Sequence, residues 1–164
     1  MTASFQHPSV PFLMAALLIP LIRTDKYRWL LPIPALMAVA SVLTMPTGTH
    51  GVIHYLGQIL TTGRVDTLSI VFAHVFAIQS VIGFIYALHL KDRAQHVAAN
   101  LYVAGGFGCV FAGDYLTLFI FWELMSIAST MLIWLNRAPR STAAGFRYFL
   151  FHTLGGLMLL AGML

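Results

Sequence analysis

The stretch YLTLFIFWELMSIASTMLIW, residues 115–134, decides how the rest of the chain is interpreted. It is predominantly apolar, and its length is about the 20 residues that a helix needs to cross a bilayer. Glu123 is the only charged side chain in it. Because an ionisable group near the centre of such a span costs about 3 kcal/mol on insertion scales, Glu123 is the first candidate functional residue. The alternative is that Glu123 stays protonated and only hydrogen-bonds to a neighbouring helix.

The composition extends this interpretation to the whole chain. Of its 164 residues, 59% are hydrophobic and only 9% are charged, too few for the surface of a water-soluble domain. The Lys and Arg residues lie in small groups between apolar runs, which excludes a nucleic-acid-binding face. A single cysteine excludes an internal disulfide. Since the sequence has no dinucleotide fingerprint, Fe–S ligand spacing or P-loop, we expect no cofactor and no catalytic residue.

The apolar runs predict an all-α, polytopic integral membrane protein that forms one domain over residues 1–164. We expect about six transmembrane helices, at residues 8–22, 29–45, 65–90, 95–113, 115–135 and 143–164. Residues 46–64 cannot span, and we expect them on the membrane surface as a hairpin or a short amphipathic element. Asp66 opens the third span and Asp114 precedes the fifth, positions where a carboxylate caps exposed helix N–H groups. The first ten residues lack the features of a secretory signal, so we treat them as part of the mature chain.

The distribution of basic residues predicts the orientation. The loops after the second and fourth spans hold one basic residue, Arg64. The loops after the first, third and fifth spans hold seven: Arg23, Lys26, Arg28, Lys91, Arg93, Arg137 and Arg140. By the positive-inside rule, the basic loops face the cytoplasm and both termini lie outside.

Four histidines are candidate functional groups. His152 and His74 lie inside the sixth and third spans, where an imidazole could relay protons because it titrates near neutrality. For His74, the alternative is a hydrogen bond to a neighbouring helix. His50 and His54 have the spacing of a metal pair on a helix, but no third ligand accompanies them, so we predict no metal site.

Two patterns concern helix packing. On a helical wheel, Ser126 and Thr130 share one side with Glu123, and we expect this polar stripe to face another helix or a water-filled cavity. The fourth span carries two adjacent rows of small residues, a pattern that lets helix backbones approach closely in membranes: Ala104, Gly108 and Ala112, and Gly105, Cys109 and Gly113.

Three segments carry a resemblance to a known family: VDTLSIVF at residues 65–72, GDYLTLFIFWELMSIASTMLIW at 113–134 and FRYFLFHTLGGLMLLAGML at 146–164. They resemble the N-terminal portion of the large antiporter-like subunits shared by Mrp-type sodium/proton antiporters, respiratory complex I and membrane-bound hydrogenases. The ending FxxHxLGGLxLLAG most resembles the D subunit of Mrp-type antiporters or its close relatives.

The resemblance implies a fold of about fourteen helices, of which this chain supplies the first part. It also implies that Glu123 is the family's fifth-helix glutamate, which modulates a proton-carrying lysine through an intramembrane ion pair. No lysine follows Lys91, so we expect either a fragment of a longer subunit or a split subunit completed by another polypeptide.

The function implied by the resemblance is that of a component of a multisubunit monovalent cation/proton antiporter in the plasma (inner) membrane. Its partners would be the lipid bilayer, other membrane subunits, protons and sodium ions. The alternative is a proton-pumping or scaffolding membrane-arm subunit of a complex I-like NADH-quinone oxidoreductase or a membrane-bound hydrogenase. A third interpretation, an isolated helical packing protein, predicts that Glu123 tolerates Leu with improved stability.

Overall fold

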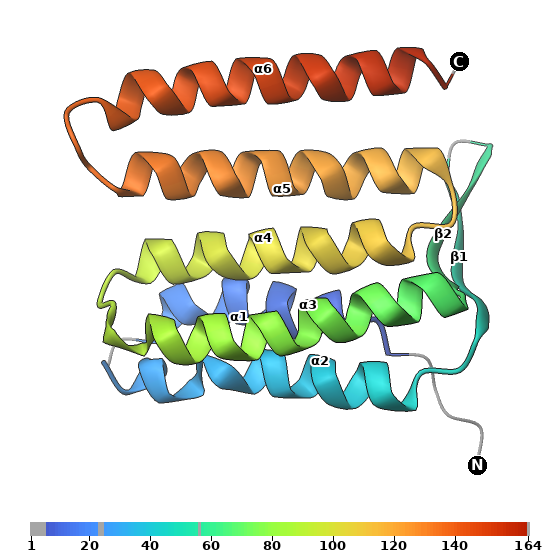
Figure 1. Cartoon of the computed structure of the whole chain (residues 1–164), viewed down its shortest axis with the longest axis horizontal. Coiled ribbons are helices and arrows are strands. Elements are labelled where there is room, and N and C mark those ends of the chain that lie inside the picture. Colours follow the sequence, from blue (N-terminus) through green and yellow to red (C-terminus); the bar gives the residue numbers. More distant parts are fainter. Residues whose placement is uncertain (1–5, 23–24, 56, 164) are drawn as a thin grey trace.

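The chain folds into a bundle of helices that lie side by side, closed at one end by a β-hairpin (Figure 1). The computed structural model describes residues 6–22, 25–55 and 57–163. Short 3-10 turns flank some of the helices, which are α1 (Ser9–Leu18), α2 (Pro32–Thr44), α3 (Thr67–Tyr86), α4 (Arg93–Phe111), α5 (Tyr115–Leu135) and α6 (Ser141–Ala161). The predicted helical membrane fold is confirmed.

By length and composition, three helices of the described chain can cross a membrane: Thr67–His89, Tyr115–Leu135 and Ser141–Ala161. Two apolar helices, Ser9–Leu21 and Arg28–Thr44, are shorter. The first turns of α4 carry polar side chains, including Gln95, His96 and Asn100. Because these shorter or more polar helices lie alongside the long ones (Figure 1), six spans remain our prediction.

Residues 48–65 form a β-hairpin. The sequence pattern had left open whether this segment is a hairpin or a short amphipathic element. Strands β1 (Gly48–Tyr55) and β2 (Gln58–Val65) pair antiparallel, with Val52 opposite Thr61 and Ile53 opposite Leu60. Gly57 precedes β2 with a φ of 78°, a left-handed conformation that glycine adopts without steric cost. The hairpin packs against the ends of α4 and α5.

Carboxylate caps begin α3 and α5, as the sequence predicts. Asp66 accepts a hydrogen bond from the Ser69 backbone N–H (2.8 Å), and the Ser69 hydroxyl accepts one from the Asp66 N–H. Asp114 accepts from the Thr117 N–H (2.7 Å) and also from the backbone N–H of Thr61 in β2. Asp114 therefore holds the hairpin to the start of the Glu123 helix.

We expect Asp114→Ala to lower the free energy of unfolding by about 1 to 2 kcal/mol, the range for loss of a good cap. Partial burial raises the pKa of Asp114, but hydrogen bonds from Thr117 and Thr61 outweigh it and bring the pKa below the ordinary 3.8. This contribution is therefore present above pH 3.8 and is lost as the pH falls further. Heat-induced unfolding of the purified protein measures both effects, with Asp114→Asn as a control that keeps an acceptor oxygen. Equal stability of the Ala and Asn variants would contradict the cap.

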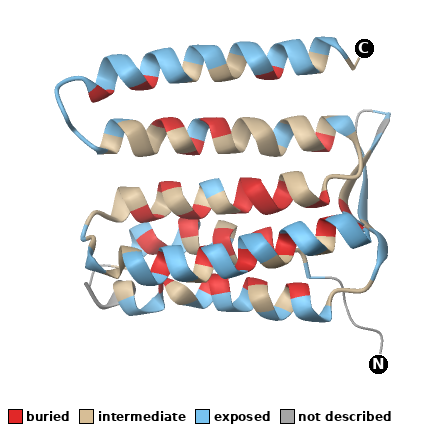
Figure 2. Ribbon diagram, viewed as in Figure 1, coloured by how far each residue is buried: buried red, intermediate tan, exposed pale blue. Residues whose placement is uncertain are grey.

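Helix α4 lies in the middle of the bundle and packs on α1, α3 and α5, and buried residues run along it (Figure 2). Phe107 of α4 is fully buried and stacks on Phe12 of α1 at a ring distance of 5.7 Å. Phe12 stacks in turn on Phe84 of α3 at 5.8 Å. These rings join three helices into one core.

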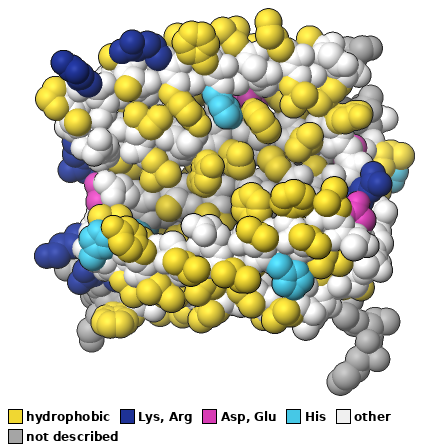
Figure 3. All heavy atoms as spheres, viewed as in Figure 1, with side chains coloured by type: hydrophobic (Ala, Val, Ile, Leu, Met, Phe, Trp, Pro, Cys, Tyr) yellow, Lys and Arg dark blue, Asp and Glu magenta, His cyan; other side chains and the backbone are white. Residues whose placement is uncertain are grey.

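The outer surface is that of a protein in a bilayer. Hydrophobic side chains cover much of the face seen in Figure 3, whereas charged groups gather near the ends of the helices. Leu17, Leu68 and Met158 are 74%, 66% and 77% exposed, which is favourable in hydrocarbon and costly in water. At the end of the bundle opposite the hairpin, called the loop end below because the α3–α4 and α5–α6 loops lie there (Figure 1), Arg137 donates to Asp92 at 2.9 Å. The chain is an integral membrane protein, and its orientation remains a prediction.

Candidate functional site at the interface of α5 and α6

Glu123 lies in the middle of α5, on the side that packs against α6. Its carboxylate approaches the backbone of α6 so closely that a Cβ at Gly156 would collide with Glu123 Oε1. Phe119, one turn before Glu123, lies against the same glycine. The absence of a side chain at Gly156 is what lets the carboxyl group lie between the two helices.

Several polar atoms at this interface are buried without a hydrogen-bond partner in the described parts of the chain. They are Glu123 Oε1 and Trp122 Nε1 on α5, and His152 Nε2 and Thr153 Oγ1 on α6. Buried polar groups in native proteins are nearly always hydrogen-bonded. The interface therefore requires further polar partners, such as water molecules or groups of another polypeptide.

His152 is held between two aromatic rings. Its imidazole stacks on Trp122 of α5 and on Tyr148 of α6, each at a centroid distance of 5.4 Å and an interplanar angle of 17°. The Tyr148 hydroxyl accepts a hydrogen bond from Ser129 of α5 at 3.1 Å. Gly156 follows His152 by four residues on the same side of α6, so His152 lies about 6 Å along the helix axis from the place where Glu123 meets α6.

The polar stripe of α5 is turned toward the interior of the bundle. Its one side-chain hydrogen bond within the described part of the chain stays within the helix. Ser126 and Thr130 are 0% and 1% exposed. Thr130 Oγ1 donates to the Ser126 carbonyl at 2.8 Å, and Ser126 Oγ has no partner among the described residues. Since α5 runs from the hairpin end to the loop end (Figure 1), these groups lead from the loop end toward Glu123.

His74 does not belong to this cluster. Its Nδ1 donates to the Ile70 carbonyl one turn earlier in α3, at 2.8 Å. Helix α3 packs on α2 and α4, whereas α5 packs on α4 and α6. Arg147, the basic residue of α6, also lies outside this cluster. Its Nε donates to the Ala143 carbonyl at 3.3 Å, on an exposed part of the helix.

The histidine pair of residues 50 and 54 lies on the hairpin and not on a helix. His50 Nε2 donates to the Pro46 carbonyl at 3.1 Å. No group of three or more His, Cys, Asp or Glu side chains suited to a metal ion occurs among the described residues.

The small residues that we expected in the fourth span divide into two sets. Ala104, Gly105 and Gly108 are buried, and a Cβ at Gly105 would lie 2.7 Å from Met125 Cγ of α5. Ala112 and Gly113, which we expected inside the fourth span, follow the last helical residue. The helix ends there because the Gly113 N–H donates to the Thr61 carbonyl of β2, at 2.8 Å, instead of to the preceding turn.

The sequence singles out Glu123 and His152, which the structure brings to one interface, but it gives no complete signal for the aromatic stack. Tyr148 and His152 are four residues apart on α6, which places them on one side of the helix, so this half of the stack had a sequence signal. Trp122 had none, because its contact with His152 depends on how α5 and α6 rotate against each other.

Comparison with known proteins covers this same region. Residues 112–164, which contain α5 and α6, match the family described as NADH:quinone oxidoreductase/Mrp antiporter, TM. The protein named antiporter subunit mnhA2 from Staphylococcus aureus strain MRSA252 is 29% identical over 109 residues, covering 62% of this chain and 14% of that protein. The same subunit from strain JH9 has equal identity and coverage.

A solved structure shares the fold of nearly the whole chain. It is the membrane-bound sulfane sulfur reductase, an archaeal respiratory membrane complex, with a TM-score of 0.66 and 19% identity. The match covers 96% of this chain and 35% of the other. The chain thus spans well under two thirds of the length of these relatives.

Proposed function

The chain belongs to the superfamily of antiporter-like membrane subunits, and we propose that it is a component of a multisubunit monovalent cation/proton antiporter. Within it, Glu123 contributes a proton-binding carboxylate to the transmembrane proton path. The observation that carries this proposal is the Glu123 carboxylate lying against Gly156, between two helices that are long enough to cross a membrane. An acid in such a position is expensive and is a functional site by default.

The arrangement of this chain's own residues suggests a direction for the path. Ser126, Thr130, His152 and Tyr148 all lie between Glu123 and the loop end of the bundle. A proton arriving from that end could pass through waters held by these groups and reach the carboxylate. By the positive-inside rule this end is cytoplasmic, so we propose an entry from the cytoplasm that ends at Glu123. The D-subunit assignment stays a prediction.

The second candidate is a membrane-arm subunit of a redox complex, favoured by the fold shared with a respiratory membrane complex. Vesicles containing the assembled complex separate the two. An antiporter moves protons when a sodium gradient is applied without an electron donor. A redox arm moves protons only after a donor is added. Proton movement that needs the donor would overturn the antiporter proposal.

His152→Phe tests the relay next to Glu123. Phe keeps an aromatic ring between Trp122 and Tyr148 but removes the ring nitrogens, so we expect proton flux to fall by about tenfold. Loss of a positioned proton-transfer group usually costs about 10² to 10⁴, and water can replace part of the relay here. His74→Phe is the matched control and should keep its flux, since His74 bonds within α3. Equal flux in both variants would exclude His152 from the path.

A further inference from the structure

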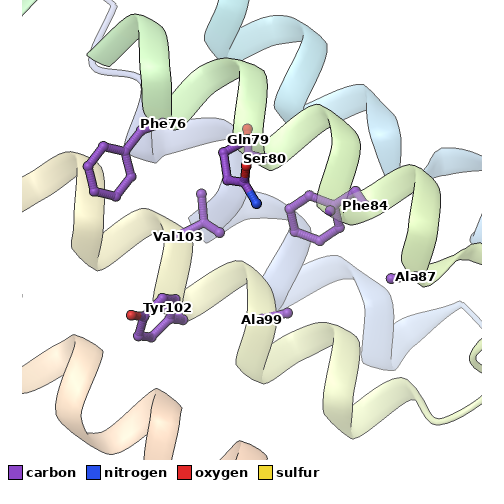
Figure 4. Close-up of a pocket in the computed structure, with 9 residues that line it drawn as sticks. Phe76, Gln79, Ser80, Phe84, Ala87, Ala99, Tyr102 and Val103 are labelled. Carbon is purple, nitrogen blue, oxygen red and sulfur yellow. The ribbon is translucent and has the colours of Figure 1, made fainter. Parts of the chain in front are cut away.

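A groove lies between α3 and α4 (Figure 4), and none of its lining residues belongs to the Glu123 site. Its volume is about 270 Å³. Most of its lining is apolar, with Phe76 and Phe84 on the α3 wall and Ala99 and Val103 on the α4 wall. Such a groove on a membrane-spanning helix faces lipid or another polypeptide.

Two hydrogen-bonding side chains enter this apolar groove from opposite walls. Gln79 of α3 is exposed, and Tyr102 of α4 is 41% exposed. Gln79 lies seven residues before the end of α3 and Tyr102 nine residues after the start of α4, so both lie roughly 10 to 14 Å from the loop end. Neither side chain hydrogen-bonds to another residue in the described portion of the chain. Hydrocarbon offers an amide or a phenol no partner at this depth.

The groove is also open where a helix could approach. A Cβ at Gly83 would meet nothing within 4 Å, and the next small residue lining the groove, Ala87, lies four residues later, where the 3-10 turn after α3 begins. Two small residues at this spacing allow a second helix to lie close to the backbone. Gln79 is one turn from Gly83, so close backbone approach and a hydrogen bond can occur together.

We propose that this groove seats a transmembrane helix of a partner subunit, which presents a hydrogen-bonding side chain to Gln79 and Tyr102. A lipid acyl chain would fill the volume but would leave both polar groups without partners, whereas a helix satisfies them. The proposal rests on the proposed function only for the existence of partner subunits. It does not depend on Glu123.

Photo-crosslinking of the assembled complex in native membranes tests the proposal. Benzoylphenylalanine replaces Phe76 in the groove, or Ile78 as a control that is 59% exposed on the opposite side of α3. We expect position 76 to link to a transmembrane peptide of another subunit and position 78 to link to lipid. Gln79→Leu and Gly83→Leu should each reduce the position 76 adduct at least fivefold, whereas Glu123→Gln should leave it unchanged.

The other outcomes overturn the inference. A lipid adduct alone at position 76, or a peptide from a second copy of this chain or from a later helix of the same polypeptide, would show a different occupant. A partner adduct that survives Gln79→Leu would show that no hydrogen bond at this residue selects the helix. Because flux through Glu123 is measured separately, failure of the groove and failure of the proton path are distinguishable.

Discussion

Glu123→Gln is expected to lower proton flux through the assembled complex by at least about a hundredfold, the usual range for loss of a proton-transfer group. Gln matches Glu in size and can still lie against Gly156, but its amide cannot take up and release a proton. The complex should therefore assemble normally. Vesicles with an internal pH-sensitive dye measure the flux, and native electrophoresis of the solubilised membranes measures assembly.

Two further variants at Glu123 separate transport from packing. Glu123→Asp keeps the acid but is one methylene shorter, so we expect partial flux. Glu123→Leu removes the polar group altogether; if the chain were only a packing element, this variant would raise the temperature of unfolding without functional loss. Unchanged flux in Glu123→Gln would remove this residue from the path.

Gly156→Ala is expected to produce the second largest effect, a fall in proton flux of about tenfold or more. The new Cβ collides with Glu123 Oε1, so the carboxylate must leave its place or the helices must separate. Overpacking of this kind typically costs about 1 to 3 kcal/mol. The flux assay and heat-induced unfolding together show whether displacement of the acid or loss of stability dominates.

The neighbouring glycine supplies a matched control. A Cβ at Gly155 meets nothing within 4 Å, and each Gly→Ala change gains up to about 1 kcal/mol of helix propensity. Gly155→Ala should therefore be neutral or slightly stabilising, with normal flux. If Gly156 acts through Glu123, the double variant Glu123→Gln, Gly156→Ala should be no worse in flux than Glu123→Gln alone. Equal flux in the two Ala variants would contradict the close contact.

Local signals in the sequence were sufficient for several features of the structure. Asp66 and Asp114 were identified as caps because a carboxylate before an apolar run has one main local use, and both accept the expected backbone hydrogen bonds. The inward position of Ser126 beside Glu123 followed from helical spacing. These features depend only on residues within one or two turns of each other.

Features set by distant contacts could not be predicted. The ending of α4 at Phe111 depends on Gly113 bonding to Thr61, which lies about fifty residues earlier. His7 is another case, since its imidazole stacks on Phe121 of α5 at 6.1 Å. Burial lowers the pKa of His7 to about 4, so this ring is neutral at physiological pH. Nothing in the polar N-terminal sequence indicated such a contact.

The proposed role of Glu123 requires its side chain to change its protonation during turnover. Infrared difference spectroscopy of the assembled complex, recorded after a sodium jump, detects the carboxyl C=O stretch of a protonated acid. We predict a C=O band that appears or disappears with the jump in the native protein and is absent in Glu123→Gln. The same band in Glu123→Gln would assign the proton to another acid and contradict the account.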